Sequence, residues 1–304
     1  MTSPTWFEGF TTQRITTAGA EIFVRTGGTV GAPPLLLLHG FPQTHALWHR
    51  VAQQLARDYF LVLPDLRGYG DSSHAPGLPD HSNYSKRALA ADMVAVMDAL
   101  GIARFGVCGH DRGGRVAHRL AVDHPERVQG LCVIDIAPTL DMYAATDFAY
   151  ASAYYHWFHL IQPTPLPETM ILGAPLPYLH TKLGGWGGTG TTFIEPQAMA
   201  EYERCFLLPG TVHSMCEDYR ASAGIDLEHD RASRALPNGA GRIACNTLVL
   251  WGERGVVNRL FDPLALWQAQ CAATVTGVAM AAGHFIPEEL PELTARHLKE
   301  FFHG

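Results

Sequence analysis

An aspartate on a glycine-bounded turn is the most reactive feature of this sequence. The segment GHDRG at 109–113 follows the apolar run FGVC and precedes a helical pattern that ends near Pro125. A strand, a sharp turn and a helix in this order expose the central side chain at the carboxyl end of the strand. The carboxylate of Asp111 is therefore a candidate nucleophile that displaces a leaving group from a carbon atom and forms an ester.

Such an ester is released only if water attacks it, so the chain also needs an oxyanion hole and a base. The backbone N–H groups of Phe41, in the turn HGFP, and of Arg112 are the candidate oxyanion donors. His284, in AGHF after the extended run TVTGVAM, is the candidate base. For the acid that orients the imidazole we favour Asp135, after the run LCVI, and keep Glu253, after TLVLWG, as the alternative.

These residues follow short apolar runs that end in turn residues. The runs are PLLLLHG (34–40), YFLVLPD (59–65), FGVCGHD (105–111), LCVIDI (131–136) and TLVLWGE (247–253). Continuous apolar runs of this length are typical of buried parallel strands. The pattern over 86–101 predicts a helix between two of them, ended by Gly101. We therefore expect a mostly parallel central sheet flanked by helices on both faces.

The strand pattern is interrupted between about residues 139 and 227. This segment is rich in aromatic residues and prolines, contains GGWGGTG at 184–190, and has no run that resembles a core strand. We predict a helical cap over 139–227, inserted into an α/β core whose two parts are 1–138 and 228–304.

Composition excludes several classes of function. The 304 residues carry a formal net charge of -7 without a lysine-rich or arginine-rich tract, which argues against nucleic-acid binding. No stretch approaches the roughly 20 apolar residues of a membrane span, and MTSPTWFEGFTTQR has no features of a secretory signal. The six cysteines form no C-x-x-C pair and the 16 histidines no H-E-x-x-H pair. We expect a reduced cytoplasmic protein without a metal site.

Seven motifs together resemble one family. HGFPQ, DLRGYGDSS, GHDRGGR, VIDIAPT, YHWF, CEDYRA and AGHF resemble the haloacetate dehalogenases, including fluoroacetate dehalogenases, of the α/β-hydrolase superfamily, over almost the whole chain. The resemblance implies an α/β-hydrolase fold with an inserted helical cap, no cofactor, and hydrolysis of a carbon–halide bond. It implies that Asp111 attacks the halogen-bearing carbon in an SN2 displacement, and that His284, paired with Asp135, activates the hydrolytic water.

The resemblance also implies the residues that hold a small haloacid substrate. Arg112 and Arg115 match the arginines that bind its carboxylate; they lie three residues apart, on one helix face, and guanidinium groups bind carboxylates through paired hydrogen bonds. An acidic partner would instead make either arginine structural. His156, Trp157 and Tyr219 match the donors that stabilise the departing halide.

The sequence leaves other expectations open. Trp186, in GGWGGTG, is a further candidate for the pocket wall. An epoxide hydrolase of the same superfamily would use Asp111 and His284 in the same way, although Arg112 favours an anionic substrate. A ligand-binding protein with a hydrolase shell is a third reading, and the absence of G-x-S-x-G disfavours a serine esterase. The resemblance implies a homodimer, and the motifs do not distinguish fluoride from the heavier halides.

Overall fold

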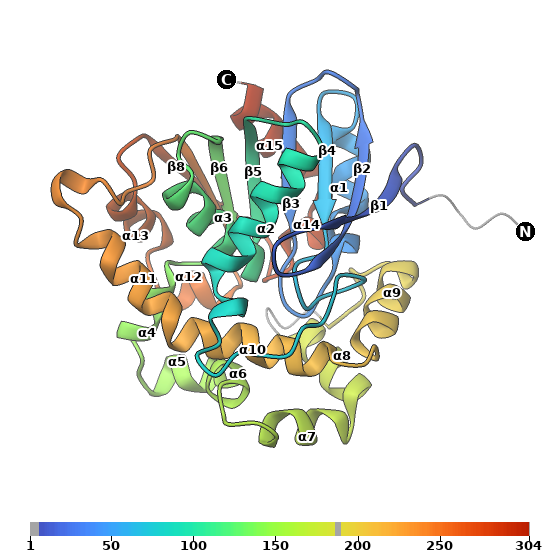
Figure 1. The fold of residues 1–304 in the computed structure, drawn as a ribbon, viewed down its shortest axis with the longest axis vertical. Coiled ribbons are helices and arrows are strands. Elements are labelled where there is room, and N and C mark those ends of the chain that lie inside the picture. Colours follow the sequence, from blue (N-terminus) through green and yellow to red (C-terminus); the bar gives the residue numbers. More distant parts are fainter. Residues whose placement is uncertain (1–5, 186–189, 304) are drawn as a thin grey trace, which may run out of the picture.

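One central sheet organises the molecule (Figure 1). The structure is a computed structural model that describes residues 6–185 and 190–303. Its eight strands lie in the order β1-β2-β4-β3-β5-β6-β7-β8. The strands are β1 (Thr11–Thr16), β2 (Glu21–Gly28), β3 (Pro34–Leu38), β4 (Phe60–Pro64), β5 (Phe105–His110), β6 (Val128–Ile134), β7 (Thr247–Gly252) and β8 (Val275–Met280).

Only β2 runs against the other strands of this sheet. It pairs antiparallel with β1 on one side and with β4 on the other, and all neighbours from β4 to β8 are parallel. The five predicted strands correspond to β3, β4, β5, β6 and β7. The prediction of a mostly parallel sheet is therefore confirmed.

The hairpin of β1 and β2 was not predicted. In β1 only Ile15 is buried, and in β2 the buried residues, such as Ile22 and Val24, alternate with less buried ones. A strand at the edge of a sheet needs few apolar side chains, because one of its faces stays in contact with water. It therefore lacks the continuous apolar run that identifies the central strands.

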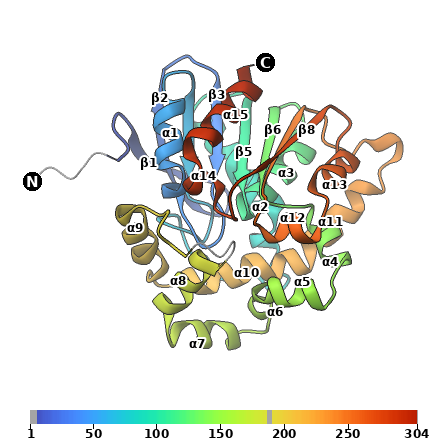
Figure 2. The same cartoon turned by 180° about the vertical axis from the view of Figure 1, so that it is seen from behind.

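Helices cover both faces of the sheet (Figures 1 and 2). Alternate residues of β3 belong to separate apolar clusters, Leu36 and Leu38 to one and Leu35 and Leu37 to the other. Helices α2 and α3 lie on the first face, and α1 and α15 lie on the second. The helices of the core are α1 (His49–Leu55), α2 (Lys86–Ala99), α3 (Arg112–Asp123), α12 (Val256–Leu260), α13 (Pro263–Gln270), α14 (Ile286–Glu289) and α15 (Pro291–His303), with 3-10 turns η1 (His45–Trp48), η2 (Ser82–Tyr84) and η3 (Pro237–Gly239).

The predicted helix over 86–101 is α2. The Ser85 side chain accepts a hydrogen bond from the Ala88 N–H group and caps its first turn. The chain leaves the helix through Gly101, whose φ of +72° is a left-handed conformation that suits glycine.

The inserted segment is helical where the structure describes it. No strand occurs in the described residues between 139 and 227, and the helices gather below the carboxyl ends of the parallel strands (Figure 1). They are α4 (Thr139–Ala144), α5 (Phe148–Ala153), α6 (Tyr155–Leu160), α7 (Leu166–Leu172), α8 (Pro175–Gly185), α9 (Pro196–Phe206) and α10 (Thr211–Ala223). Helix α11 (Ile225–Arg234) crosses the predicted boundary at residue 227, so the limits of the cap stay a prediction. No helix in the described ranges has the length and apolar character that crossing a bilayer requires.

Helix α3 begins unusually close to the ends of β3 and β5. A Cβ atom on Gly113 would lie 2.3 Å from the carbonyl oxygen of His39 and 2.5 Å from that of Leu38. Both atoms belong to the backbone and cannot rotate away. Glycine at position 113 therefore sets how near the first turn of α3 comes to the sheet.

We predict that Gly113→Ala lowers the free energy of unfolding by about 3 kcal/mol, because the added methyl group must push α3 away from the sheet. Urea unfolding followed by circular dichroism measures this change. Gly185→Ala is the matched control, since a Cβ atom there has no neighbour within 4 Å among the described residues. Equal stability of the two variants would contradict the close approach.

Candidate active site

Asp111 occupies the turn between β5 and α3. Its φ of +46° and ψ of -115° are a backbone conformation that non-glycine residues rarely adopt, and such conformations typically cost about 1–3 kcal/mol. The residue is buried, and 9% of its side-chain surface is exposed. Strain at this point is typical of a turn that must present one side chain in one direction.

The candidate base and acid meet Asp111 from neighbouring strands. His284 Nδ1 donates to Asp135 Oδ2 at 2.6 Å, and His284 Nε2 lies 3.9 Å from Asp111 Oδ2. Asp135 follows β6, and its other oxygen accepts from the Gly252 N–H group at 3.0 Å. Glu253 is exposed. The structure thus places Asp135, and not Glu253, against the imidazole.

Charges around Asp111 favour its ionised form. Burial alone raises the pKa of Asp111, but the charges of His284 and of the arginines at 112 and 115 outweigh burial and hold the pKa below 3.8. Burial also lowers the pKa of His284, whereas the hydrogen bond and charge of Asp135, together with the charge of Asp111, raise it above 6.5. An ionised carboxylate therefore faces a basic imidazole.

The two oxygens of Asp111 have different surroundings. Oδ1 accepts a hydrogen bond from the Phe41 N–H group at 3.0 Å, whereas Oδ2 is the oxygen nearer His284. Gly40 makes this contact possible, because a Cβ atom there would lie 2.5 Å from Asp111 Cβ. The structure thus brings the Phe41 amide to the position expected of an oxyanion donor, and the role of the Arg112 N–H group stays a prediction.

Arg112 is buried and has an acidic partner. Its Nε atom donates to Asp218 Oδ2 at 2.7 Å, and Nη2 donates to the Asp218 carbonyl oxygen at 2.7 Å and to Ser222 Oγ. The guanidinium carbon lies 4.1 Å from the ring centre of Tyr219. Its Nη1 atom is buried without a hydrogen-bond partner in the described residues. One edge of Arg112 is therefore structural, and one nitrogen stays available.

Arg115 forms no hydrogen bond to a carboxylate in the described part of the chain. Nη1 donates to the Ala137 carbonyl oxygen at 3.0 Å and to Thr139 Oγ1 at 2.9 Å, and Nη2 lies 3.2 Å from Met142 Sδ. The guanidinium carbon lies 4.7 Å from the ring centre of Trp157. The buried Nε atom has no hydrogen-bond partner within the described ranges. A buried cation with neutral partners is suited to hold an anionic ligand.

The predicted halide residues form one aromatic cluster beside the elbow. Tyr219 lies with its ring centre 5.6 Å from that of His156 and 6.2 Å from that of Trp157. Phe41 stacks on His156 at 6.0 Å and meets Tyr219 edge-on at 5.3 Å. The buried Tyr219 hydroxyl has no hydrogen-bond partner in the described residues. Trp186 lies outside those residues.

Sequence reasoning missed the charged residues behind Arg112. Lys86 Nζ contacts Asp218 Oδ1 and lies 3.5 Å from Asp226 Oδ2, and Tyr69 Oη donates to Asp218 Oδ2 at 2.8 Å. Asp218 stands in the motif CEDYRA, directly before Tyr219, but nothing in the sequence indicates that its carboxylate pairs with Arg112 and Lys86. Two cations and two carboxylates balance each other in this cluster, which links α2 and α3 to α10 and α11.

One set of metal-ligand types occurs elsewhere in the described chain. Atoms of Asp71, Glu201 and Cys205 lie within 4.8 Å of one another. Arg204 Nη2 donates to all three, at 2.7, 2.7 and 3.1 Å respectively. A guanidinium cation therefore already occupies the position that a metal would need.

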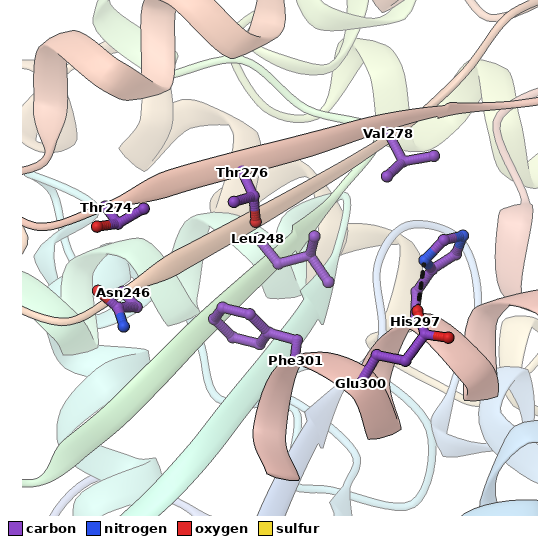
Figure 3. Close-up of a pocket in the computed structure, with 8 residues that line it drawn as sticks. All are labelled: Asn246, Leu248, Thr274, Thr276, Val278, His297, Glu300 and Phe301. Carbon is purple, nitrogen blue, oxygen red and sulfur yellow. Dashed lines mark ion pairs between the residues drawn. The ribbon is translucent and has the colours of Figure 1, made fainter. Parts of the chain in front are cut away.

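A cavity of about 360 Å³ is lined by residues of β7, β8 and α15 (Figure 3). Two further lining residues, Asn246 and Thr274, directly precede the two strands. Among its lining residues, His297 Nδ1 lies 3.6 Å from Glu300 Oε2. The cavity thus opens near the amino ends of the strands, whereas Asp111 and Asp135 follow their carboxyl ends.

We predict that Asp218→Asn destabilises the protein by about 3–5 kcal/mol, because removing one charge leaves the buried cations of Arg112 and Lys86 without full compensation. Urea unfolding measures the change. Asp71→Asn is the control: its partner Arg204 is 45% exposed, and such surface pairs typically contribute about 0–1 kcal/mol. A similar loss of unfolding free energy in both variants would show that the buried ion pairs of Asp218 stabilise the protein no more than a surface pair does.

Known proteins resemble this chain over nearly its whole length. The profile of the alpha/beta hydrolase fold matches residues 33–291. A fluoroacetate dehalogenase from Burkholderia sp. is 43% identical over 97% of this chain and 94% of its own. A soluble epoxide hydrolase from Corynebacterium sp. (strain C12) is 30% identical over 88% of this chain and 90% of its own.

A solved structure from Nostoc sp. PCC 7120, called an α/β hydrolase, superposes with a TM-score of 0.93 at 50% identity, covering 97% of this chain and 99% of its own. The resemblance to the haloacetate dehalogenases inferred from the motifs is thereby confirmed. The chain belongs to the α/β-hydrolase fold family.

Proposed function

We propose that this protein is a haloacetate dehalogenase that hydrolyses fluoroacetate, chloroacetate or both to glycolate and halide. One observation carries the proposal: an ionised Asp111 stands beside two buried arginines that each keep a donor nitrogen without a partner in the described residues. The similarity to the fluoroacetate dehalogenase from Burkholderia sp. supports the same substrate class.

In the first step the substrate carboxylate binds to Arg112 Nη1 and Arg115 Nε. This places the neighbouring carbon near Asp111, which converts the reaction into an intramolecular one. Asp111 Oδ2 forms a bond to this carbon while the carbon–halogen bond breaks, and the halide leaves with the bonding electron pair. The Tyr219 hydroxyl, with donors from His156 and Trp157, stabilises the charge that develops on the halogen.

In the second step water attacks Cγ of the Asp111 ester, and His284 Nε2 accepts its proton. Oδ1 becomes the oxyanion, at the position where it already receives the Phe41 N–H group. Asp135 stabilises the imidazolium. The Cγ–Oδ2 bond then breaks, glycolate leaves with Oδ2, and the proton from His284 completes its hydroxyl group. Asp111 keeps the oxygen of the water and releases the second proton of that water to solvent, which restores the carboxylate.

Ester formation also prepares the base. The charge of Asp111 contributes to the raised pKa of His284, and alkylation removes that charge. The pKa of His284 therefore falls in the ester, so that a larger fraction of the imidazole is neutral when a base is needed.

An epoxide hydrolase is the second candidate, because the relative from Corynebacterium sp. is matched over most of the chain. Such an enzyme would use Asp111 and His284 in the same way. A neutral epoxide offers no carboxylate to Arg115, however, so the arginines favour the dehalogenase. The arrangement of Asp111, Asp135 and His284 likewise argues against a protein that only binds ligands.

Two further expectations accompany the proposal. The six cysteines are free thiols, which agrees with the reduced cytoplasmic location expected from the sequence. That location and the homodimer implied by the resemblance stay predictions.

Halide release tests the function. Purified protein is incubated with fluoro-, chloro- and bromoacetate, and halide is measured by ion chromatography, with styrene oxide hydrolysis measured in parallel. We expect halide from at least one haloacetate and, for that substrate, an equal amount of glycolate. Hydrolysis of styrene oxide without halide release from any haloacetate would favour the epoxide hydrolase.

We predict that Asp111→Asn abolishes halide release, whereas His284→Asn still releases about one halide per active site and then stops, because the ester forms but no base activates water. Intact-mass spectrometry of His284→Asn after substrate addition should show a carboxymethyl group on the enzyme, and peptide mapping should place it on Asp111. An unmodified His284→Asn protein beside an active native enzyme would rule out the two-step reaction.

We predict that Arg115→Ala raises KM for the haloacetate by about 10- to 100-fold, because a charge-assisted hydrogen bond contributes about 1.5–3 kcal/mol. Steady-state kinetics measures KM. Arg119→Ala is the control: Arg119 lies on the same helix, is equally buried and binds Asp123 and Asp230, so its loss lowers stability and leaves KM unchanged. The same KM change in both variants would remove the carboxylate role of Arg115.

A further inference from the structure

A cluster of three polar side chains is buried close to the site, and none of the steps above uses it. Tyr202 Oη donates to Glu288 Oε1 at 2.6 Å, and Gln43 Nε2 donates to Glu288 Oε2 at 3.1 Å. Gln43 Nε2 also lies 3.2 Å from Tyr202 Oη. All three side chains are at most 1% exposed. Burying a carboxyl group without a cationic partner costs free energy. Its presence here therefore suggests a role in the structure or in the reaction.

Gln43 belongs to the loop that forms the oxyanion hole. Its backbone N–H group donates to the Gly40 carbonyl oxygen at 2.9 Å and closes the turn that contains Phe41. The Phe41 N–H group in this turn contacts Asp111 Oδ1. A side-chain contact that holds Gln43 therefore holds the backbone on which the oxyanion donor lies.

Glu288 and Tyr202 extend this contact to the base and to the cap. Glu288 lies in α14, four residues after His284, and its N–H group donates to the Phe285 carbonyl oxygen at 2.9 Å. Tyr202 lies on α9 of the cap, which Figure 2 shows beside α1 and α14. One carboxyl group thus joins three elements: the oxyanion loop, the segment that carries the base, and a cap helix.

No cation is hydrogen-bonded or ion-paired to Glu288 in the contacts of the described residues. The charges of Arg50 on α1 and of Glu195, directly before α9, act on the pKa of Glu288 in opposite directions, and Glu195 is itself 3.1 Å from His49 Nε2. Burial raises the pKa of Glu288 to about 8, so at neutral pH the carboxyl group holds a proton. Gln43 Oε1 is buried without a hydrogen-bond partner in the described ranges, and a rotated amide would accept that proton's hydrogen bond.

We propose that Glu288 is a positioning residue for the second step of the reaction: it holds the oxyanion loop through Gln43 and ties this loop to the cap through Tyr202. The inference rests on the proposed function. Loss of the carboxyl group lets the Phe41 N–H group move away from the developing oxyanion, and hydrolysis of the Asp111 ester slows more than its formation.

The test separates the two steps by mass. Native enzyme, Glu288→Ala, Glu288→Gln and Tyr202→Phe are quenched during turnover of the haloacetate that the native enzyme uses, and the fraction carrying the ester is measured by intact-mass spectrometry. We expect Glu288→Ala to lower kcat by about tenfold and to raise the ester-bearing fraction several-fold, because a misplaced oxyanion donor slows only the step that uses it. Glu288→Gln, which keeps the shape and the hydrogen bonds, restores most of kcat. Tyr202→Phe shifts the ester fraction in the same direction as Glu288→Ala and keeps the test decisive if that variant fails to fold.

Leu298→Ala is the control for stability, because Leu298 is buried on α15 and its apolar side chain takes no part in the hydrogen bonds of the cluster. It lowers the Tm but leaves the ester-bearing fraction at the native value. An unchanged ester fraction in both Glu288→Ala and Tyr202→Phe would overturn the positioning role, whereas a native enzyme that releases no halide from any haloacetate would overturn the proposed function itself.

A second measurement follows the proton on Glu288. The pKa is about 8 in the folded protein and 4.5 ordinarily, so the stabilising effect of the protonated group is complete below pH 4.5 and is lost as the pH rises through 8. The urea midpoint of Glu288→Gln relative to the native protein should therefore increase with pH across this window. A difference that stays constant with pH would show that Glu288 is not protonated in the folded protein. It would then have no proton to donate to a rotated Gln43 amide.

Discussion

The whole site depends on keeping one carboxylate ionised in a place from which water is largely excluded. Burial of Asp111 acts against its charge, so its surroundings must supply compensation. His284 and the two arginines provide that compensation, and each does so from a different part of the fold: the arginines from the first turn of α3, the imidazole from the loop after β8. The sheet matters here because the parallel strands β3, β5, β6, β7 and β8 bring the loops at their carboxyl ends to one edge.

The same requirement explains why the cap is tied to the core through charges. Arg112 projects from the core, and its partner Asp218 comes from α10, directly before Tyr219. The contact that neutralises one edge of Arg112 therefore also places the Tyr219 ring against the guanidinium and Phe41. The positions of Arg112 and Tyr219, which are distant in the sequence, are thus linked by one buried ion pair.

Much of this arrangement could be predicted from the sequence, because it rests on local patterns. The apolar runs predicted β3 to β7, and the glycines around Asp111 predicted the elbow. The β1–β2 hairpin escaped prediction because Ile15 alone is buried in β1. Asp218, Lys86 and Glu288 escaped it for another reason: their contacts join residues more than 80 positions apart, and no spacing in the chain encodes such a meeting.

The choice between Asp135 and Glu253 shows the same limit. Both follow a buried strand, and both stand at the correct edge of the sheet, so sequence order alone does not separate them. The structure does, because the positive φ of Asp135 turns its carboxylate under the imidazole while Glu253 faces solvent. Backbone conformation, which the residue types did not reveal, decides the partner.

The donor nitrogens of Arg112 and Arg115 that have no partner in the described residues have a consequence for turnover. In the proposed reaction the carboxylate that Arg112 and Arg115 hold is the same in haloacetate, in the transition state and in glycolate. Contacts of equal strength to all three bind and orient the ligand, but they do not stabilise the transition state more than the bound substrate. That additional stabilisation must come from the groups whose contacts change, namely Asp111, the Phe41 amide and the halide donors. In that reaction the arginines would hold the product as firmly as the substrate, so the affinity that captures a dilute acid would also set the rate of product release.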